Sequence, residues 1–274
     1  MILESDGLMQ KIIDFHTHAF PKVLASKAVN NIGSHYSIPM SGTGKIEDLI
    51  KSAQKADITY LVLHSTATRP NQVQNINNWI AKQVRFSEGR IIGFGTLHPD
   101  MDGIEKEFNR IISLGLRGVK LHPDFQGFKA DAPELDKIYS LLENRLPLLI
   151  HAGDANLDNS SPERIARILD RFPKLTLIAA HLGGYMQWRE AMEYLAGKNL
   201  YLDTSSTLHY MDTEFAMQII KTHGAKRIVF GTDYPAVLHT DELERFMALK
   251  LSRQERQDIL YNNAARILNI PEEC

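Results

Sequence analysis

Short apolar runs rich in β-branched residues recur along the chain, and each is followed by a segment whose apolar positions have a different spacing. Almost every interior position of these runs is apolar, as expected of parallel strands that are buried on both faces. The runs are KIIDFHTH (11–18), ITYLVLHS (58–65), RIIGFGTLH (90–98), RGVKLHP (117–123), PLLIHAG (147–153), LTLIAAHLGG (175–184), NLYLDTSS (199–206) and RIVFGTDYP (227–235). The pattern therefore predicts eight buried strands.

Segments with helical periodicity lie between these runs, with apolar residues at every third or fourth position. The segments predicted as helices are 45–56, 102–114, 133–144, 162–171, 187–196, 212–223, 240–250 and 252–268. Strands that alternate with helices require parallel pairing, so residues 1–274 are predicted to form one α/β domain, a (β/α)₈ TIM barrel. An open doubly wound sheet is the alternative, but no strand leads into a glycine-rich phosphate loop.

The connection after the first run, residues 19–45, is far longer than the two to six residues that usually link a strand to its helix. It contains Pro39, three glycines and several serines. We predict that it is an active-site flap within the barrel, and a disordered surface excursion is the alternative. Residues 1–10 are predicted to form an extra strand or a loose arm.

Histidine and aspartate gather at the C-terminal ends of the predicted strands, which form the rim that carries the chemistry in barrels of this kind. Burying so many imidazoles beside a carboxylate is unfavourable unless a cation compensates them. The residues at strand ends are His16, His18, His64, His98, His122, His151, His181 and Asp233. The sequence therefore predicts a divalent metal site at this rim.

The His-Thr-His pair at the end of the first strand is the starting point of that site. Side chains alternate along a strand, so Asp14, His16 and His18 are predicted to lie on one face. Residues two apart along such a strand are separated by about 7 Å. A third histidine from another strand and the carboxylate of Asp233, on the neighbouring last strand, would complete a shell suited to zinc. Asp14 is predicted either to orient His16 or His18 by a hydrogen bond or to be a structural acid near the barrel floor.

Composition excludes several classes of partner. The formal net charge is −2, which favours neither nucleic acid nor an anionic membrane. No apolar run approaches the ~18–20 residues of a membrane span, and the N-terminus does not read as a secretory signal. Cys274 is the single cysteine, so no disulfide can form within the chain, which fits a cytoplasmic protein. We expect a small-molecule substrate, and a homo-oligomer remains open.

Five motifs together resemble the amidohydrolase superfamily, most closely its amidohydrolase-2 branch, which includes the aminocarboxymuconate semialdehyde decarboxylase-like proteins. They are IDFHTH (13–18), GVKLHP (118–123), LIHAG (149–153), AAHLGG (179–184) and VFGTDYP (229–235). The resemblance implies a metal ion, zinc or a similar divalent ion, held by His16, His18, His151 and Asp233. His181 matches a further histidine of that family, which either ligates a second ion or acts on the substrate.

The fourth strand departs from the pattern of binuclear members, which carry a carboxylated lysine or a glutamate at its tip. Lys120 would bridge two ions if carboxylated, would bind a substrate carboxylate as a cation, or would pair with an acid inside the barrel. We favour one ion, since the branch resembled mostly uses one. Lys120, His122 and Arg69 are then predicted to form a positive wall opposite the metal, with His209 as a further substrate contact.

The site predicts a hydrolase of a small ester, lactone or amide, in which Asp233 accepts a proton from a metal-activated water and His181 stabilises the oxyanion. The alternative is a decarboxylase of a small unsaturated or aromatic carboxylic acid, which would use the same residues. Less favoured interpretations are a barrel that binds metal without catalysis, and a phosphoesterase, which would normally need more acidic ligands than the sequence offers.

Overall fold

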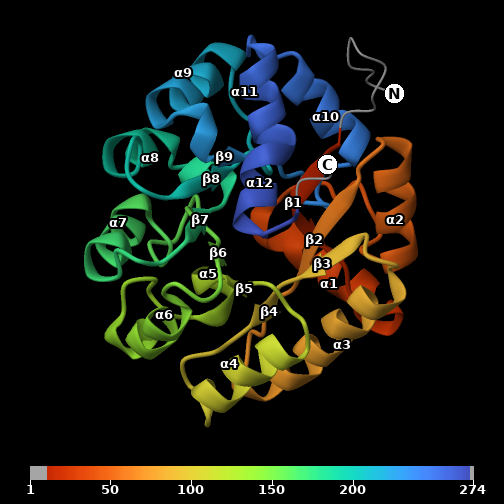
Figure 1. Cartoon of the computed structure of the whole chain (residues 1–274), viewed down its shortest axis with the longest axis vertical. Helices are drawn as coiled ribbons and strands as arrows, with labels where there is room; N and C mark the ends of the chain where they lie inside the picture. Colours follow the sequence, from red (N-terminus) through yellow and green to blue (C-terminus); the bar gives the residue numbers. More distant parts are fainter. Residues whose placement is uncertain (1–10, 272–274) are drawn as a thin grey trace.

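A ring of parallel strands, surrounded by helices, forms the centre of the computed structural model, which describes residues 11–271 (Figure 1). The predicted arm at residues 1–10 lies outside the described residues, as does Cys274. The strands are β1 (Ile13–His18), β2 (Tyr60–His64), β3 (Ile91–Gly93), β4 (Gly95–Thr96), β5 (Val119–Leu121), β6 (Leu148–Ile150), β7 (Leu177–Ala179), β8 (Tyr201–Asp203) and β9 (Ile228–Val229).

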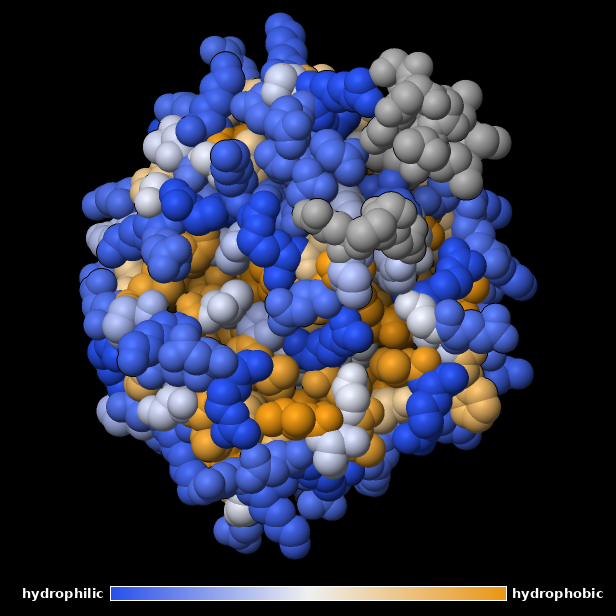
Figure 2. Space-filling view, viewed as in Figure 1, coloured by the Kyte–Doolittle hydropathy of each residue, from blue (hydrophilic) through white to orange (hydrophobic). Residues whose placement is uncertain are grey.

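Helices follow the strands around the outside of the ring. They are α1 (Lys22–Tyr36), α2 (Ile46–Lys55), α3 (Val73–Phe86), α4 (Ile104–Ser113), α5 (Pro123–Gln126), α6 (Asp136–Leu142), α7 (Pro162–Arg171), α8 (Trp188–Tyr194), α9 (Thr213–His223), α10 (His239–Met247), α11 (Arg253–Gln257) and α12 (Asn263–Ile267). On the face shown in Figure 2, hydrophilic side chains cover the outer helices and apolar side chains show between them toward the centre. Within residues 11–271, no helix is long and apolar enough to cross a lipid bilayer.

The strands pair in sequence order, all in parallel, in two sheets that join at the third predicted strand. That strand is divided into β3 and β4 at Phe94. The N–H of Phe94 donates to Leu63 O at 3.0 Å, on the β2 side, and the N–H of Gly95 donates to Gly118 O at 2.9 Å, beside β5. The interruption is therefore confined to Phe94, and backbone hydrogen bonds continue the ring of strands on both sides of it.

Backbone hydrogen bonds also close the ring between the last strand and the first. The N–H of Phe15 donates to Phe230 O at 2.8 Å, and the N–H of His18 donates to Tyr234 O at 2.7 Å. In return, the N–H of Asp233 donates to His16 O at 2.8 Å. The predicted eight-unit (β/α)₈ barrel is thus confirmed, with its third strand in two pieces.

A β-bulge in β1 changes which of its side chains face the barrel interior. The pairing of β1 with β2 shifts register between Asp14 and Thr17. Ile13 and Phe15 pack in the buried apolar cluster that fills the inside of the barrel, while the carboxylate of Asp14 lies 3.4 Å from Nε2 of His239, on α10. The predicted alternation, with Asp14 on the face of His16 and His18, is wrong because a bulge breaks the two-residue period.

Apart from the four-residue α5, two helices, α1 and α3, were not expected from the periodicity of the sequence. In α1 only Ala25 and Val29 are buried, so its apolar stripe is weak. In α3 the buried stripe includes a polar residue, Asn77, whose side chain donates to Thr96 O at 3.1 Å and to Glu107 Oε1 at 2.7 Å. Tertiary contacts rather than a clean apolar pattern therefore fix these two helices.

Candidate metal centre

A cavity of about 850 Å³ opens at the C-terminal ends of the strands, where the polar strand-end residues were expected. Helix α1 and the connection from β2 to α3 form its outer walls. Seven of the residues singled out in the sequence line it and so share one space: His16, His18, Lys120, His122, His151, His181 and Asp233, with Arg69 at the margin.

The hydrogen bond between His16 and Asp203 decides which nitrogen of that imidazole is free. Nδ1 of His16 lies 2.7 Å from Asp203 Oδ2, in a pair that is almost completely buried. An ionised carboxylate only accepts, so Nδ1 carries the proton and Nε2 has a bare lone pair. That lone pair faces Oδ1 of Asp233 at 3.4 Å, and Nε2 of His18 lies 3.2 Å from the same oxygen.

The same reasoning applies to His151 and His181, whose rings are held by backbone carbonyls. Nε2 of His151 donates to Gly153 O at 2.8 Å, and Nδ1 of His181 donates to Ser205 O at 2.9 Å. The nitrogens left bare, Nδ1 of His151 and Nε2 of His181, face each other at 3.0 Å. Two lone pairs at this distance repel unless a cation lies between or beside them.

Bare acceptors therefore converge from four strands, and the residues present fit a divalent cation. Their spacing of 3.0–3.4 Å is that of neighbouring ligands around one ion with bonds of ~2.0–2.2 Å. The other nitrogen of each ring is held by an acceptor, from Asp203, Gly153 or Ser205. Acceptors of this kind fix the tautomer of metal-binding histidines in general. His16, His18 and Asp233 lie together, whereas His151 reaches this group through His181.

Asp233 remains ionised in this setting. Burial by itself would raise its pKa, but the charge of neighbouring imidazoles when they are protonated, above all His16, and the hydrogen bond with His18 outweigh burial and lower the pKa below its ordinary value. Its other oxygen accepts a hydrogen bond from Ser206 Oγ at 2.6 Å. The carboxylate is thus oriented on one side and available on the other.

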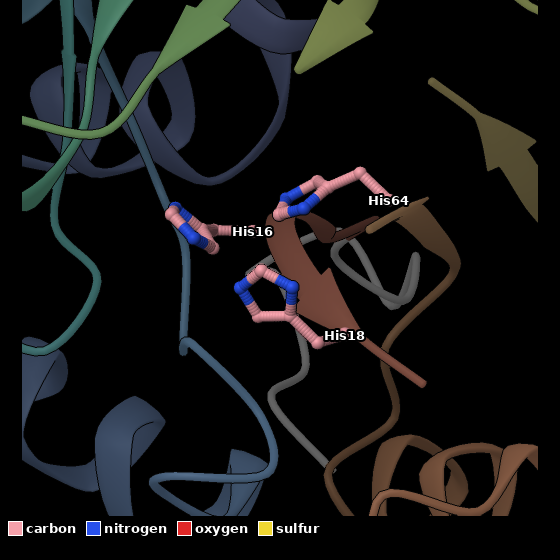
Figure 3. Close-up of side chains that lie close together, drawn as sticks. All are labelled: His16, His18 and His64. Carbon is pink, nitrogen blue, oxygen red and sulfur yellow. The ribbon is translucent and has the colours of Figure 1, made fainter. Parts of the chain in front are cut away.

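His64 and Asp203 belong to the site, although the sequence analysis gave them no role. The ring of His64 lies 4.7 Å from that of His16 and 4.4 Å from that of His18, and both of its nitrogens lack a partner among the described residues (Figure 3). Burial lowers the pKa of His64 well below its ordinary value, so the ring is neutral. Both residues end strands, β2 and β8, which is the signal that marked the others.

The four predicted substrate contacts lie at different depths. Nζ of Lys120 is buried without a hydrogen-bond partner among the described residues, and burial lowers its pKa to about 8. Arg69 is exposed at the margin, so Lys120 and Arg69 do not form one continuous wall. His209 is exposed, packs on Tyr210 at 3.7 Å and is not among the residues that line the cavity.

A second compact group, His122, Asp124 and His151, turns no bare ring nitrogen toward Asp124, because Nε2 of His151, 3.9 Å from Asp124 Oδ2, donates to Gly153 O. Nδ1 of His122 accepts a hydrogen bond from the N–H of Phe125 at 3.3 Å, which leaves the proton on Nε2. The ring stacks on that of His151 at 3.8 Å. Hydrogen bonding therefore accounts for this group, and it supports the rim rather than a second ion.

Replacing Asp203 by asparagine tests the role given to its carboxylate. Asp203→Asn should lower metal affinity roughly 10- to 100-fold, because the proton on Nδ1 of His16 loses its charged acceptor. Competition with a chelator measures this affinity. Asp241→Asn, on the exposed side of α10, is the control and should bind metal as the wild type does. Equal affinity in both variants would mean that Asp203 does not set the tautomer.

The chain shows similarity both to a curated protein and to solved structures. 2-Amino-3-carboxymuconate-6-semialdehyde decarboxylase of Caenorhabditis elegans is 35% identical over 127 residues, which span 39% of this chain but only 31% of that relative. A 2,6-dihydroxybenzoate decarboxylase complexed with 2,6-dihydroxybenzoate superposes with a TM-score of 0.75 at 18% identity, over 96% of this chain and 100% of the other.

A second solved structure holds a metal. Dihydroxybenzoic acid decarboxylase from Polaromonas sp. JS666, with bound manganese and the inhibitor 2-nitroresorcinol, superposes with a TM-score of 0.72 at 18% identity, over 97% of this chain and 98% of the other. At this level of identity the two structures establish the shared fold. The family assignment comes from the sequence, because residues 13–270 match the model of the family described as Amidohydrolase. The chain is therefore an enzyme of the amidohydrolase family, in its amidohydrolase-2 branch.

Proposed function

We propose that this enzyme is a metal-dependent decarboxylase of a small unsaturated or aromatic carboxylic acid. The observation that supports the metal site is the convergence of bare acceptors from His16, His151, His181 and Asp233, whose mutual repulsion a divalent cation would relieve. We assign the ion to His16, His18, His151 and Asp233, with one ion per chain. Zinc was expected from the sequence, and the manganese in one solved neighbour makes manganese the other candidate.

Decarboxylation is preferred to hydrolysis because the relative with substantial sequence identity is named a decarboxylase. The sequence analysis placed hydrolysis first and decarboxylation second, since the ligand set alone serves both reactions. The comparison reverses that order. Hydrolysis of a lactone or ester is then the competing outcome of the test given below.

The reaction breaks the bond between the substrate carbon and its carboxylate, releases CO₂ and adds a proton to that carbon. A bound divalent cation would supply Lewis-acid polarisation of substrate oxygens. Asp233 is assigned to proton transfer, because a carboxyl group with a lowered pKa is a strong acid once it has taken up a proton. His181 presents Nε2 to the same space, and the amine of Lys120 provides a buried cation for the substrate carboxylate.

Helix α1 is proposed to serve as the flap of the site. The segment 19–45 was expected to be a loop, yet most of it is this helix, and its residues form one wall of the cavity. Leu24, Ala28, Ile32 and His35 follow at helical spacing and line the cavity together. We propose that α1 excludes water from the bound substrate, within a single catalytic domain.

Elemental analysis and product detection test the proposed function together. The purified protein should contain about one divalent ion per chain and should release CO₂ from 2,6-dihydroxybenzoate or another hydroxylated aromatic or unsaturated acid of a panel. Removal of the ion by a chelator should abolish the release, and adding zinc or manganese back should restore it. Hydrolysis of lactones or esters without CO₂ release from any acid would instead support the hydrolase.

A further inference from the structure

Tyr36, the last residue of α1, is the point at which the helix touches the strand-end histidines. Its hydroxyl oxygen lies 3.1 Å from Nε2 of His122 and 3.3 Å from Nε2 of His151. Its ring packs against the ring of Tyr185 at 5.3 Å and against that of Phe125 at 5.7 Å. Tyr36 also lines the cavity, so its hydroxyl group is held at a fixed place beside the substrate space.

The two histidine nitrogens next to this hydroxyl group both carry protons. Nδ1 of His122 accepts from the N–H of Phe125, which places the proton of the neutral ring on Nε2. Nε2 of His151 donates to Gly153 O at 2.8 Å, so it too is protonated.

The hydroxyl proton of Tyr36 consequently has no acceptor on either ring. Its oxygen accepts from Nε2 of His122 and faces the N–H of His151, and no described residue accepts a hydrogen bond from it. Tyr36 is half-buried, and the direction left open for its hydroxyl proton is the cavity.

We propose that Tyr36 donates a hydrogen bond to an anionic oxygen of the substrate, and so makes the flap helix a part of substrate recognition. This inference rests on the proposed function for the class of substrate, an acid with at least two acceptor oxygens, one for the ion and one for Tyr36. His122 is a positioning residue in this arrangement, since it occupies the hydroxyl oxygen and directs the proton away from itself. Its ring is fixed in turn by stacking between Phe125 at 4.1 Å and His151 at 3.8 Å.

Binding measurements on the metal-loaded protein test the donor. Tyr36→Phe keeps the ring contacts and removes only the hydroxyl group. For 2,6-dihydroxybenzoate we expect Kd to rise roughly 10- to 100-fold, as for the loss of a hydrogen bond to a charged group. Resorcinol, which lacks the carboxylate, identifies the acceptor. An equal loss with resorcinol assigns a ring oxygen, and no loss with resorcinol assigns the carboxylate. Unchanged binding of 2,6-dihydroxybenzoate would overturn the proposal.

Tyr194→Phe, on α8 and outside the cavity lining, is the matched control and should bind both probes as the wild type does. Metal content should be the same in all three proteins. These measurements need no turnover. The expected change in Kd can therefore be absent while CO₂ release is observed, and it can be present while no CO₂ is released.

A ligand-free readout covers the case in which neither probe binds the wild type. Nitrogen NMR of the labelled, metal-loaded protein should show the proton of His122 on Nε2, and Tyr36→Phe should shift that Nε2 resonance. A bare Nε2 on His122 would mean that Tyr36 gives its proton to this ring, and the proposal would be wrong. In His122→Ala the phenol loses its fixed orientation, so the Kd of a probe that binds should rise while metal content stays unchanged.

Discussion

Changing His16 and His18 together to alanine is expected to remove the metal ion and to lower kcat/KM at least about a thousandfold. Nε2 of His16 and Nε2 of His18 lie 3.4 and 3.2 Å from Asp233 Oδ1, so the double change would remove both imidazole ligands beside this carboxylate. A catalytic metal supplies several kcal/mol of transition-state stabilisation, and each 1.36 kcal/mol is a factor of ten in rate. Elemental analysis measures the metal, and steady-state kinetics measures the rate.

The control for this variant is His209→Ala, because His209 is an exposed histidine that does not line the cavity. It should keep both metal and activity. If the double variant retains its metal content, the assignment of the ion to His16 and His18 is wrong, whatever happens to the rate.

Replacing Lys120 by methionine is expected to stabilise the metal-free protein at pH 7 by about 3 kcal/mol, while raising KM for carboxylated substrates. Burial lowers the pKa of the Lys120 amine to about 8 from an ordinary value of 10.5. Each unit of that shift is 1.36 kcal/mol, which gives the estimate. Methionine has a similar length, needs no hydrogen bond and removes a buried amine that has no partner among the described residues.

The pH dependence gives this prediction its sign. Below pH 8 the amine is charged in both states, and the folded state bears the full cost of burying it. Between pH 8 and 10.5 the unfolded chain binds more protons than the folded protein, so the free energy of unfolding of the wild type rises with pH. Lys120→Met lacks this rise, and the advantage of the variant should therefore vanish by about pH 10.5.

Urea denaturation at pH 7 and pH 10 measures both effects. Lys51→Met, on an exposed position of α2, is the control and should follow the wild type at each pH. A less stable Lys120→Met protein would mean that the amine is paired in solution. Loss of one ion from a protein that held two would instead identify Lys120 as a carboxylated bridge.

The barrel could be predicted from sequence because parallel strands that are buried on both faces appear as continuous apolar runs. The proximity of His16, His18 and Asp233 could be predicted from the same runs, since these residues lie at the C-terminal ends of strands and such ends share one rim. The orientation of Asp14 could not be predicted, because the bulge in β1 changes the register without any local signature in the sequence.

The helices α1 and α3 escaped prediction for another reason. Val23 is 90% exposed on α1, and Asn77 occupies a buried position on α3, so neither segment shows a clean apolar stripe. The part played by Asp203 was equally hidden, since its partner His16 is 187 residues away along the chain. Long-range pairs of this kind arise only when the ring closes.

The seam between β9 and β1 has a consequence for how the protein matures. The donors that meet there come from the start of the chain, at His16 and His18, and from near its end, at Asp233. A nascent chain could therefore present the two histidines of β1 early, but Asp233 would join them only after the other strands of the ring have been synthesised. With the proposed ligands, a bound ion would link the first strand to the last and would stabilise the closed ring against opening at this seam.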